Sequence, residues 1–558
     1  MSRPKASTVT PIAAPLLVDS AVNVTWSESA DVVVVGWGAA GASAALEARA
    51  QGASVLVIDR FEGGGASALS GGVVYAGGGT AQQKEAGFHD TPAAMCEYLK
   101  HEVNSVVSDA TLERFCQDSA ANLAWLESHG ARFAATMPDH KTSYPPEGKF
   151  LYYSGNEVVP AYRGDLPAGA KPAPRGHRTV AKGQSGSTLF EALKQATLKS
   201  GVKTITQASV RRLVCERGPD GQVGRVVGVE VWQMPAGDPR TTRHAELHRQ
   251  YVRWRTLRAG KATACRLEAA RLELEAAQPL LLRARQGVVL STGGYIFNPE
   301  MVKELAPHTR RGWPIGGSGC DGSGLRLGQS VQAASDALKN ISSWRFITPP
   351  AAWPMGIVVN QQGERFCNEQ VYGATLGHEL VEHQGGRAWL ILDSTLRLRA
   401  TRQCLFGQLW AFQSLPAMAM MWLKAIKGAT PEALAKRIGA DPAKLAAAIQ
   451  INNEAASGHV DDPLGKSQDM RHPLRGPLYA IDISIGNPLF PLAVLSLGGL
   501  RVNEDNGQVL NAHGQGIPCL FAAGRTAVGL PSSRYISGLS LADCVFSGRR
   551  AGRAAALS

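Results

Sequence analysis

A phenol and a hydroxyl lie two residues apart near the end of the sequence. The stretch LPSSRYISGLSLAD, residues 530–543, places Tyr535 and Ser537 just before a predicted last helix over residues 538–556. Such groups donate hydrogen bonds to an oxygen that gains charge, or remove a proton when their pKa is lowered. A free tyrosine has a pKa of about 10, so Tyr535 needs help from Ser537 and the positive helix end. The main-chain N–H of Gly538 is a further donor, and the alternative role for Ser537 is a plain N-cap.

A glycine-rich turn near the N-terminus predicts a bound cofactor. Residues 31–59 follow the pattern of strand, tight turn, helix and strand, and the turn has the sequence Gly36-Trp37-Gly38-Ala39-Ala40-Gly41. The glycines let main-chain N–H groups approach a pyrophosphate at the start of the helix. Asp59 ends the second strand, where a carboxylate accepts hydrogen bonds from ribose hydroxyls. The pattern therefore predicts a dinucleotide; a purely structural glycine turn is the alternative.

Further glycine motifs at predicted strand ends favour FAD over NAD. They are SALSGG (67–72), STGG (291–294) and FAAGR (521–525). A flavin with its ribityl chain is long, so several strand ends must reach it, and a second fingerprint for a nicotinamide nucleotide is missing. The start of the last helix can stabilise negative charge on a reduced flavin, which places Ser540 and Leu541 near the ring.

Length and composition set the broad class. A chain of 558 residues is too long for one compact core, so two or more domains are expected. No run of about eighteen apolar residues occurs, so we expect no membrane span. The N-terminal residues lack a continuous apolar core and are expected to form a loose tail or edge strand. The nine scattered cysteines include no C-x-x-C pair, which favours reduced thiols in a cytoplasmic protein without a metal site.

The positive charge is concentrated in one segment. Residues 239–285 contain eleven Lys and Arg against four Asp and Glu, which is over half of the net charge of +12. Apolar residues repeat there by three and four, which predicts a helical hairpin that turns at residues 259–261 and is inserted between two strands. It is a solvated hairpin, an oligomer contact or an attachment to an anionic membrane surface. Nucleic acid is not expected, because no base-stacking module accompanies the charge.

Five motifs in order resemble one superfamily of FAD enzymes. These are VVVVGWGAAGASAALEA with VIDR, GGGASALSGG, GVVLSTGGYIFN, NQQGERFCNE, and LFAAGR with SGLSLADCVFSGRRAG. The chain resembles the fumarate reductase and 3-ketosteroid dehydrogenase superfamily. The resemblance implies an α/β protein whose Rossmann-like FAD-binding domain is built from two segments, with an inserted α+β catalytic domain. The expected division is 1–29 (N-terminal tail), 30–333 (first FAD segment, containing the hairpin), 334–494 (catalytic domain) and 495–558 (second FAD segment).

Residues expected to contact FAD come from these motifs together with the resemblance. They are Gly36, Gly38, Ala39, Ala40, Gly41, Asp59, Arg60, Ser67, Ala68, Ser70, Gly71, Gly72, Val210, Thr292, Gly293, Asp321, Gly524, Arg525, Ser540 and Leu541.

Two tyrosines separate the chain from the fumarate-type members. In those members one arginine lies three residues beyond the glutamate of the RFxNE motif, where this chain has Tyr372, and another precedes the last helix, where this chain has Tyr535 next to Arg534. Phenols in place of cationic clamps suit a neutral ketone better than a dicarboxylate. The Tyr-x-Ser spacing is similar to 3-ketosteroid Δ4-(5α)-dehydrogenases, whereas Δ1 enzymes have small residues there. The resemblance implies that Tyr372, Tyr535, Ser537 and Gly538 are catalytic; the alternative for Tyr372 is a packed core aromatic.

The implied reaction is dehydrogenation of a 3-ketosteroid to introduce a Δ4 double bond. It removes a proton from the carbon next to the ketone and transfers a hydride to FAD. An external acceptor, either a quinone, a dye or an electron-transfer flavoprotein, then takes the electrons. The alternatives are a Δ1-dehydrogenase, an enoate reductase of the fumarate reductase type, and a flavin-binding redox or assembly scaffold. The expected location is the cytoplasm, with the inner face of the membrane as the alternative.

Overall fold

The computed structural model describes residues 7–162, 172–218, 222–256 and 258–558. A nine-stranded sheet at its centre has the order β1-β8-β9-β10-β2-β3-β7, and β21 and β20 join it through β10. Five neighbouring strands are parallel. They are β21 (Gly516–Ala522), β10 (Gln278–Leu290), β2 (Glu28–Val35), β3 (Val55–Ile58) and β7 (Lys203–Ile205). The other four are β1 (Leu16–Val18), β8 (Ala208–Arg217), β9 (Val223–Gln233) and β20 (Gln508–Leu510).

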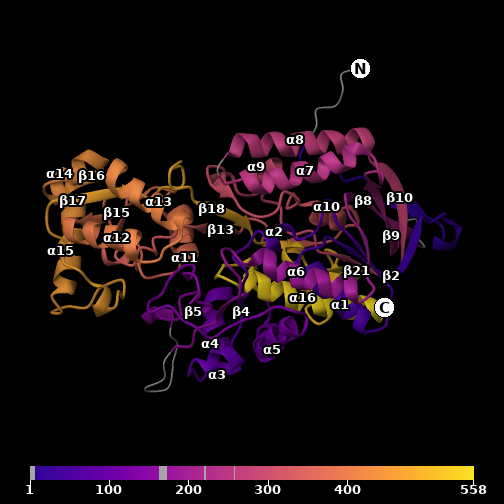
Figure 1. The fold of residues 1–558 in the computed structure, drawn as a ribbon, viewed down its shortest axis with the longest axis horizontal. Helices are drawn as coiled ribbons and strands as arrows, with labels where there is room; N and C mark the ends of the chain where they lie inside the picture. The colour runs from indigo at the N-terminus through magenta and orange to yellow at the C-terminus, as the bar shows by residue number, and fades with distance from the viewer. Residues whose placement is uncertain (1–6, 163–171, 219–221, 257) are drawn as a thin grey trace.

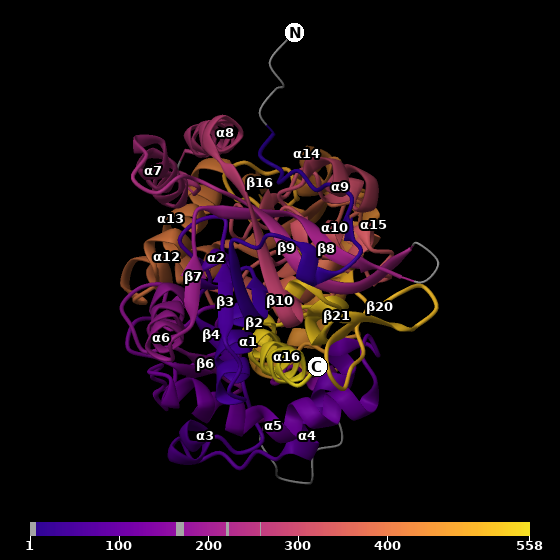
Figure 2. The same cartoon turned by 90° about the vertical axis from the view of Figure 1, so that its right-hand side faces the viewer.

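Both faces of this sheet are buried, which explains the unbroken valine run of β2. Val33 and Val35 belong to one hydrophobic core, and Val32 and Val34 belong to the other. The first and last long helices of the fold, α1 (Ala39–Ala50) and α16 (Leu539–Ala556), lie side by side on the second face (Figures 1 and 2). The two ends of the chain therefore build one layer.

Small residues let α1 and α16 approach with their backbones in contact. A Cβ atom at Gly548 would lie 2.5 Å from the carbonyl oxygen of Ala40. One at Gly552 would lie 2.1 Å from that of Ala44. The close contact fixes where the N-terminus of α16 points.

The basic segment forms a helical hairpin at the top of the molecule in Figure 1. Its helices are α7 (Pro239–Trp254) and α8 (Ala259–Ala276). The turn was predicted at residues 259–261, but these residues open α8, and α7 already ends at Trp254. The hairpin was also predicted to reach residue 285, yet residues 278–285 belong to β10. The helix-like spacing of Leu281 suggested that the helix continues to this residue, but Leu281 pairs with Glu230 across the sheet.

The chain between β3 and β7 forms a second group of elements, part of which lies at the bottom of the molecule in Figure 1. Its helices are α2 (Gly65–Ala68), α3 (Ala81–Glu85), α4 (Pro92–Val103), α5 (Asp109–Ser128) and α6 (Gly186–Lys199). A small sheet has the order β4-β6-β5, with bounds β4 (Val73–Tyr75), β6 (Gly176–Arg178) and β5 (Leu151–Tyr152). The amide of Tyr75 donates to the carbonyl of Gly538 at 3.1 Å. This bond places the small sheet against the start of α16.

Residues between the two FAD segments form the left part of Figure 1. A four-stranded antiparallel sheet has the order β14-β15-β17-β16. Its strands are β14 (Ile357–Asn360), β15 (Ala388–Asp393), β17 (Leu478–Asp482) and β16 (Ile426–Gly428). The helices around it are α11 (Gly373–His378), α12 (Ser394–Phe406), α13 (Ala411–Ala419), α14 (Pro431–Ile438) and α15 (Pro442–Ala456). This arrangement confirms the predicted fold class.

Short elements connect the two parts. They are α9 (Pro299–Leu305), α10 (Ser323–Ser330), β11 (Trp313–Pro314), β12 (Ser335–Asp336), β13 (Ile341–Trp344), β18 (Ala493–Ser496) and β19 (Gly499–Leu500). Near the N-terminus, β1 pairs with β8 as a parallel edge strand. An edge strand was one of the two structures predicted for the N-terminal residues. Within the described part of the chain no helix is long and apolar enough to cross a membrane.

Candidate active site

The carboxyl ends of the parallel strands bring the glycine motifs together. Strands β2, β10 and β21 are in register, so that Leu290 lies between Val35 and Ala522. Gly36 follows β2 with φ of +100°, and a Cβ there would lie 2.6 Å from the carbonyl oxygen of Ser291. A Cβ at Gly41 would lie only 1.9 Å from the carbonyl oxygen of Gly36. The turn therefore needs glycine at both positions, and it opens α1 at Ala39 as predicted.

Unused donors at this edge fit an anionic cofactor. Gly38 and Gly538 are the N-caps of α1 and α16 and bring no side-chain acceptor of their own, although the Ala39 amide of α1 donates to Ser67 Oγ. The two positive helix ends therefore remain available to a ligand. Behind them Arg525 is buried, and its Nη1 has no hydrogen-bond partner among the described residues. A Cβ at Gly294 would lie 3.0 Å from this nitrogen, so the chain leaves room beside it only for a glycine.

The segment after β3 lies against the start of α1. The amide of Ala39 donates to Ser67 Oγ at 3.0 Å. Ser70 Oγ donates to the carbonyl of Ser67 at 2.7 Å and accepts from the amide of Gly72 at 3.1 Å. Ala68 ends α2 within this segment, and the carbonyl of Gly71 accepts from Tyr144 Oη at 2.9 Å. The segment predicted to contact FAD is thus joined to the glycine loop.

Other predicted cofactor residues surround the same edge. Thr292 Oγ1 accepts from the amide of Gly324 at 2.9 Å, and the amide of Gly293 donates to Thr526 Oγ1 at 3.0 Å. Gly524 has φ of +58° at the end of β21. Ser540 and Leu541 lie in the first turn of α16.

Four predicted residues lie further along the sheet. Asp59 accepts from the amides of Trp37 at 2.9 Å and Phe61 at 2.8 Å, and its carbonyl accepts from Ala208 at 3.0 Å. Val210 is buried two residues along β8. Arg60 pairs with Asp321 at 3.2 Å.

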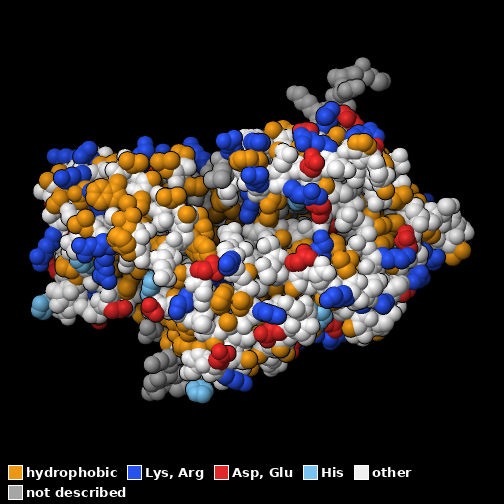
Figure 3. All heavy atoms as spheres, in the orientation of Figure 1, with side chains coloured by type: hydrophobic (Ala, Val, Ile, Leu, Met, Phe, Trp, Pro, Cys, Tyr) orange, Lys and Arg blue, Asp and Glu red, His pale blue; other side chains and the backbone are white. Residues whose placement is uncertain are grey.

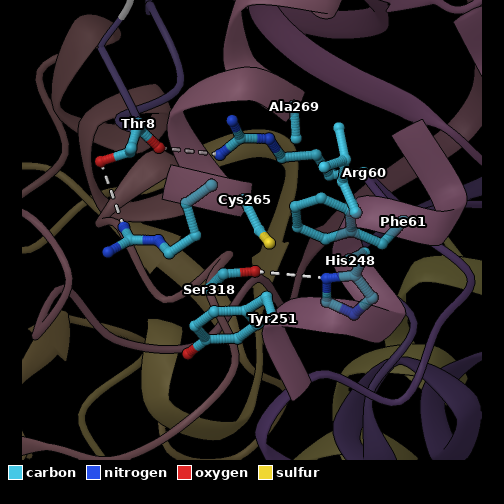
Figure 4. A pocket seen from close by; sticks show the side chains of 10 residues that line it. Thr8, Arg60, Phe61, His248, Tyr251, Cys265, Ala269 and Ser318 are labelled. Atoms are coloured by element: carbon cyan, nitrogen blue, oxygen red, sulfur yellow. Dashed lines mark hydrogen bonds between the residues drawn. The ribbon is translucent and has the colours of Figure 1, made fainter. Parts of the chain in front are cut away.

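The hairpin covers this end of the sheet. Glu273 on α8 forms two hydrogen bonds with Arg60, at 2.9 and 3.1 Å, and accepts or shares a proton with His244 on α7 at 2.8 Å. Although burial raises the pKa of Glu273, the charge of Arg60 and the contact with His244 hold it at about 2. The ring of His248 stacks on Phe61 with centroids 4.0 Å apart. A small pocket remains between the hairpin and the segment after β3, and these rings contribute to its lining (Figure 4).

Hydroxyl groups from three separate segments meet at the start of α16. Tyr152 Oη lies 3.2 Å from Ser537 Oγ. The Ser537 hydroxyl also acts on the Tyr372 phenol and opposes the large rise that burial causes in the pKa of Tyr372. The nearby Tyr535 phenol acts electrostatically on both of the other tyrosines. Ser537 is not the N-cap of α16, since that position belongs to Gly538 with φ of +90°.

Aromatic rings pack against this hydroxyl cluster. The rings of Trp344 and Tyr535 are 4.9 Å apart, and those of Phe346 and Tyr372 are 5.7 Å apart. Burial raises the pKa of Tyr535 to about 12, and the positive charge of Arg525 opposes that rise. The phenols are therefore neutral donors at neutral pH in the protein alone.

Arg534 and Tyr535 are neighbours in the sequence but act on different groups. Arg534 acts electrostatically on Glu102, Tyr162 and His378, outside the hydroxyl cluster. Tyr535 acts electrostatically on Tyr152 and Tyr372 instead.

Sequence reasoning did not include Tyr152 among the candidate catalytic residues. The missing information was the pairing of β5 with β6, which brings Tyr152 opposite Gly176 and next to the start of α16. Sequence reasoning also missed three neighbouring side chains on α11 and on the π-helix Glu379–His383 that follows it. His378, Glu379 and His383 each bring one potential ligand atom to within 4.8 Å of the others.

Comparison with known proteins agrees with this geometry. The family model described as FAD binding domain matches residues 31–541. The chain belongs to this FAD-binding family. Its cofactor is FAD, and the residues above fit that group.

The relatives include steroid-converting enzymes. The chain is 55% identical over 524 residues to "3-oxo-5-alpha-steroid 4-dehydrogenase" of Comamonas testosteroni, covering 93% of this chain and 96% of the relative. It is 27% identical to "3-oxosteroid 1-dehydrogenase" of Mycobacterium tuberculosis, covering 90% and 94%. A crystal structure of 3-ketosteroid-Δ4-(5α)-dehydrogenase from Rhodococcus jostii RHA1 with 4-androstene-3,17-dione superposes with a TM-score of 0.79 at 30% identity, covering 98% and 100%. The resemblance inferred from the motifs is confirmed.

Proposed function

We propose that this protein is an FAD-dependent dehydrogenase that introduces the Δ4 double bond into a saturated 3-ketosteroid. The named activity of the Comamonas and Rhodococcus proteins supports this substrate class. The observation that carries the proposal is the 3.2 Å contact of Ser537 Oγ with the Tyr152 phenol, in a cluster whose Tyr372 and Tyr535 phenols act electrostatically on one another. This set of neutral donors suits a ketone oxygen, where the fumarate-type members would have arginines.

The reaction removes one hydrogen as a proton and one as a hydride. The carbon next to the ketone loses the proton, and the following carbon loses the hydride with both electrons. FAD, when bound, supplies the hydride acceptor. We assign removal of the proton to Tyr535, supported by Ser537 and Tyr372. We also assign the main-chain N–H of Gly538 as a donor to the ketone oxygen as negative charge develops there.

Electrostatics explain why a phenol can serve as the base. The ordinary pKa of tyrosine is about 10, and burial moves Tyr535 further from neutrality. Arg525 and the uncapped start of α16 act in the opposite direction. A neighbouring hydroxyl that donates to the forming phenolate stabilises it further.

The direct test is turnover with a defined substrate. Purified protein should be yellow and should reduce a dye acceptor when a saturated 3-ketosteroid is added. Analysis of the product from one 5α and one 5β substrate should give a Δ4 double bond. A Δ1 product would assign the protein to the other dehydrogenase branch. Oxidation of reduced dye only in the presence of fumarate or another enoate would assign it to the reductases. Yellow protein inactive in every assay would favour the redox or assembly scaffold.

We propose the domain division stated above, with residues 30–333 and 495–558 holding FAD and residues 334–494 covering the substrate. The strand pairings support it, since β20 and β21 join the sheet built by residues 16–290. We also propose that the hairpin retains the adenosine half of FAD. In this type of fold the acid at the end of the second strand marks the ribose, and the hairpin contacts Arg60 and Phe61, which follow that acid.

We further propose a cytoplasmic location and an external acceptor of the quinone, dye or electron-transfer flavoprotein class. All nine cysteines are free, and seven are buried, which suits a reducing compartment.

A further inference from the structure

A second feature of the protein lies on the surface of the catalytic part, away from the hairpin. Residues 394–427, which form α12, α13, the π-helix Met420–Lys424 and the start of β16, hold seven of the fifteen exposed large hydrophobic side chains of the described chain. These side chains are Leu398, Leu405, Phe406, Phe412, Leu415, Trp422 and Leu423. We call this segment the apolar–basic patch. Figure 3 shows hydrophobic side chains gathered over α12 and α13 with Lys and Arg around them.

Exposure at this patch is extreme for apolar residues. Phe406 is 80% exposed, Leu423 is 77% exposed and Leu415 is 67% exposed. Concentrated exposure of this kind marks a surface that meets an apolar partner.

The charge of the patch has one sign. Its sequence contains five Lys and Arg and no Asp or Glu. The cations lie among the apolar groups, since the guanidinium of Arg397 is 3.7 Å from the centroid of the Trp422 ring. Trp422 Nε1 donates to Thr401 Oγ1 at 3.0 Å, which joins the π-helix to α12. Apolar side chains surrounded by basic ones match the interface of an anionic bilayer.

A second copy of the chain fits this surface less well. A two-fold contact would place the patch against itself and bring the five cations of each copy together with no acid to pair them. The hairpin fits a bilayer less well too. Most of its apolar residues pack into a core of their own, and Arg243 and Arg271 are paired with Glu268 and Glu275.

Aromatic rings connect the patch with the candidate active site. Phe412 stacks on Trp410, with centroids 6.4 Å apart, and Tyr144 lies 6.3 Å from Trp410. Trp410 Nε1 donates to the carbonyl of Pro145 at 3.0 Å, and Tyr144 Oη donates to that of Gly71 at 2.9 Å. The patch is therefore anchored to the segment that is expected to contact FAD.

We propose that residues 394–427 dock the protein onto an anionic lipid bilayer, so that an apolar substrate dissolved in the bilayer reaches the site without crossing bulk water. Docking follows from the patch alone, whereas delivery of a steroid rests on the proposed function. The two are tested separately: vesicle binding needs no substrate.

The test is sedimentation of the holoenzyme with phosphatidylcholine vesicles, with or without phosphatidylglycerol. We expect binding to the anionic vesicles to be at least about tenfold stronger, because several basic groups lie at the surface. The triple variant Phe406→Ser, Leu415→Ser, Leu423→Ser should lose at least about tenfold in this binding. The matched control Leu267→Ser, Leu274→Ser changes two exposed leucines on α8 and should bind as the wild type does.

Turnover distinguishes docking from damage to the site. With a water-dispersed saturated 3-ketosteroid and no vesicles, both variants should turn over as the wild type does. If the wild type does not bind anionic vesicles, the proposal is wrong. Equal loss of binding in the two variants would also overturn it. A dimer in sedimentation velocity that the triple variant abolishes, without vesicle binding, would assign the patch to a second copy. If vesicle binding holds but no ketosteroid is oxidised, only the proposed function fails.

Discussion

Replacing Tyr535 by phenylalanine gives the most direct test of the proposed chemistry. The substitution removes one oxygen and leaves the ring in place against Trp344, 4.9 Å away. With a pKa of about 12, about one Tyr535 side chain in ten thousand is a phenolate at pH 8. A rate that depends on this phenolate should rise about tenfold per pH unit and should not level off below about pH 11. Loss of the base should lower flavin reduction by about 10²–10⁴-fold.

The assay is anaerobic mixing of holoenzyme with a saturated 3-ketosteroid, followed by the loss of yellow colour between pH 6 and pH 10. Tyr535→Phe should keep its FAD, react slowly and lose the rise with pH. Tyr295→Phe is the matched control, because this buried phenol donates to the carbonyl of Leu338 outside the hydroxyl cluster. It should keep its rate within about threefold while losing about 1 kcal/mol of stability. A Tyr535→Phe enzyme that reacts within about threefold of the wild type, or keeps the rise with pH, would refute the assignment.

Three other substitutions test neighbouring parts of the site. Ser537→Ala should lower turnover by about 10²-fold or more. The control Ser154→Ala loses a 3.1 Å bond to the carbonyl of residue 537, so it should lower thermal stability and keep turnover within about tenfold of the wild type. Similar turnover in the two variants would contradict the role of the Ser537 hydroxyl. Glu273→Gln breaks the buried pair with Arg60 and should speed FAD release, measured by FAD fluorescence, by about tenfold or more. The control Glu275→Gln, on the exposed side of the same helix, should release FAD at the wild-type rate. Equal release rates in the two variants would show that the hairpin does not retain FAD. Gly41→Ala places a Cβ 1.9 Å from a carbonyl oxygen and should yield colourless or unfolded protein, so a stable yellow variant would contradict the proposed loop geometry.

The FAD-binding half could be predicted because its signals are local. Each glycine motif follows an apolar strand, and parallel strands must end at one edge, so Gly36, Thr292 and Gly524 had to lie close together. The hydroxyl cluster was harder to predict. Tyr372 and Tyr535 came from the resemblance, whereas Tyr152 lies in a loop-rich region where no periodicity marks the two-residue strand that positions it.

The errors in the hairpin have a different cause. Helical periodicity extends from α8 across the chain into β10, and only pairing with β9 shows where the helix ends. Gly260 suggested a turn but lies inside α8, where a Cβ would meet open space. Local patterns cannot reveal such tertiary choices. Neither can they reveal the apolar–basic patch, because its exposed leucines have the same sequence spacing as buried ones.

Pairing of the first and last helices has a consequence for how the protein is made. The glycine loop at residues 36–41 emerges early from the ribosome, but its neighbour α16 is synthesised some five hundred residues later. Until α16 is made, Gly548 and Gly552 cannot pack against α1, and the part of the chain already synthesised keeps that apolar face of α1 exposed. The same late helix follows directly on Tyr535 and Ser537. A chain released before residue 530 therefore lacks both part of the lining of the flavin site and the proposed base, so interrupted synthesis leaves no active enzyme.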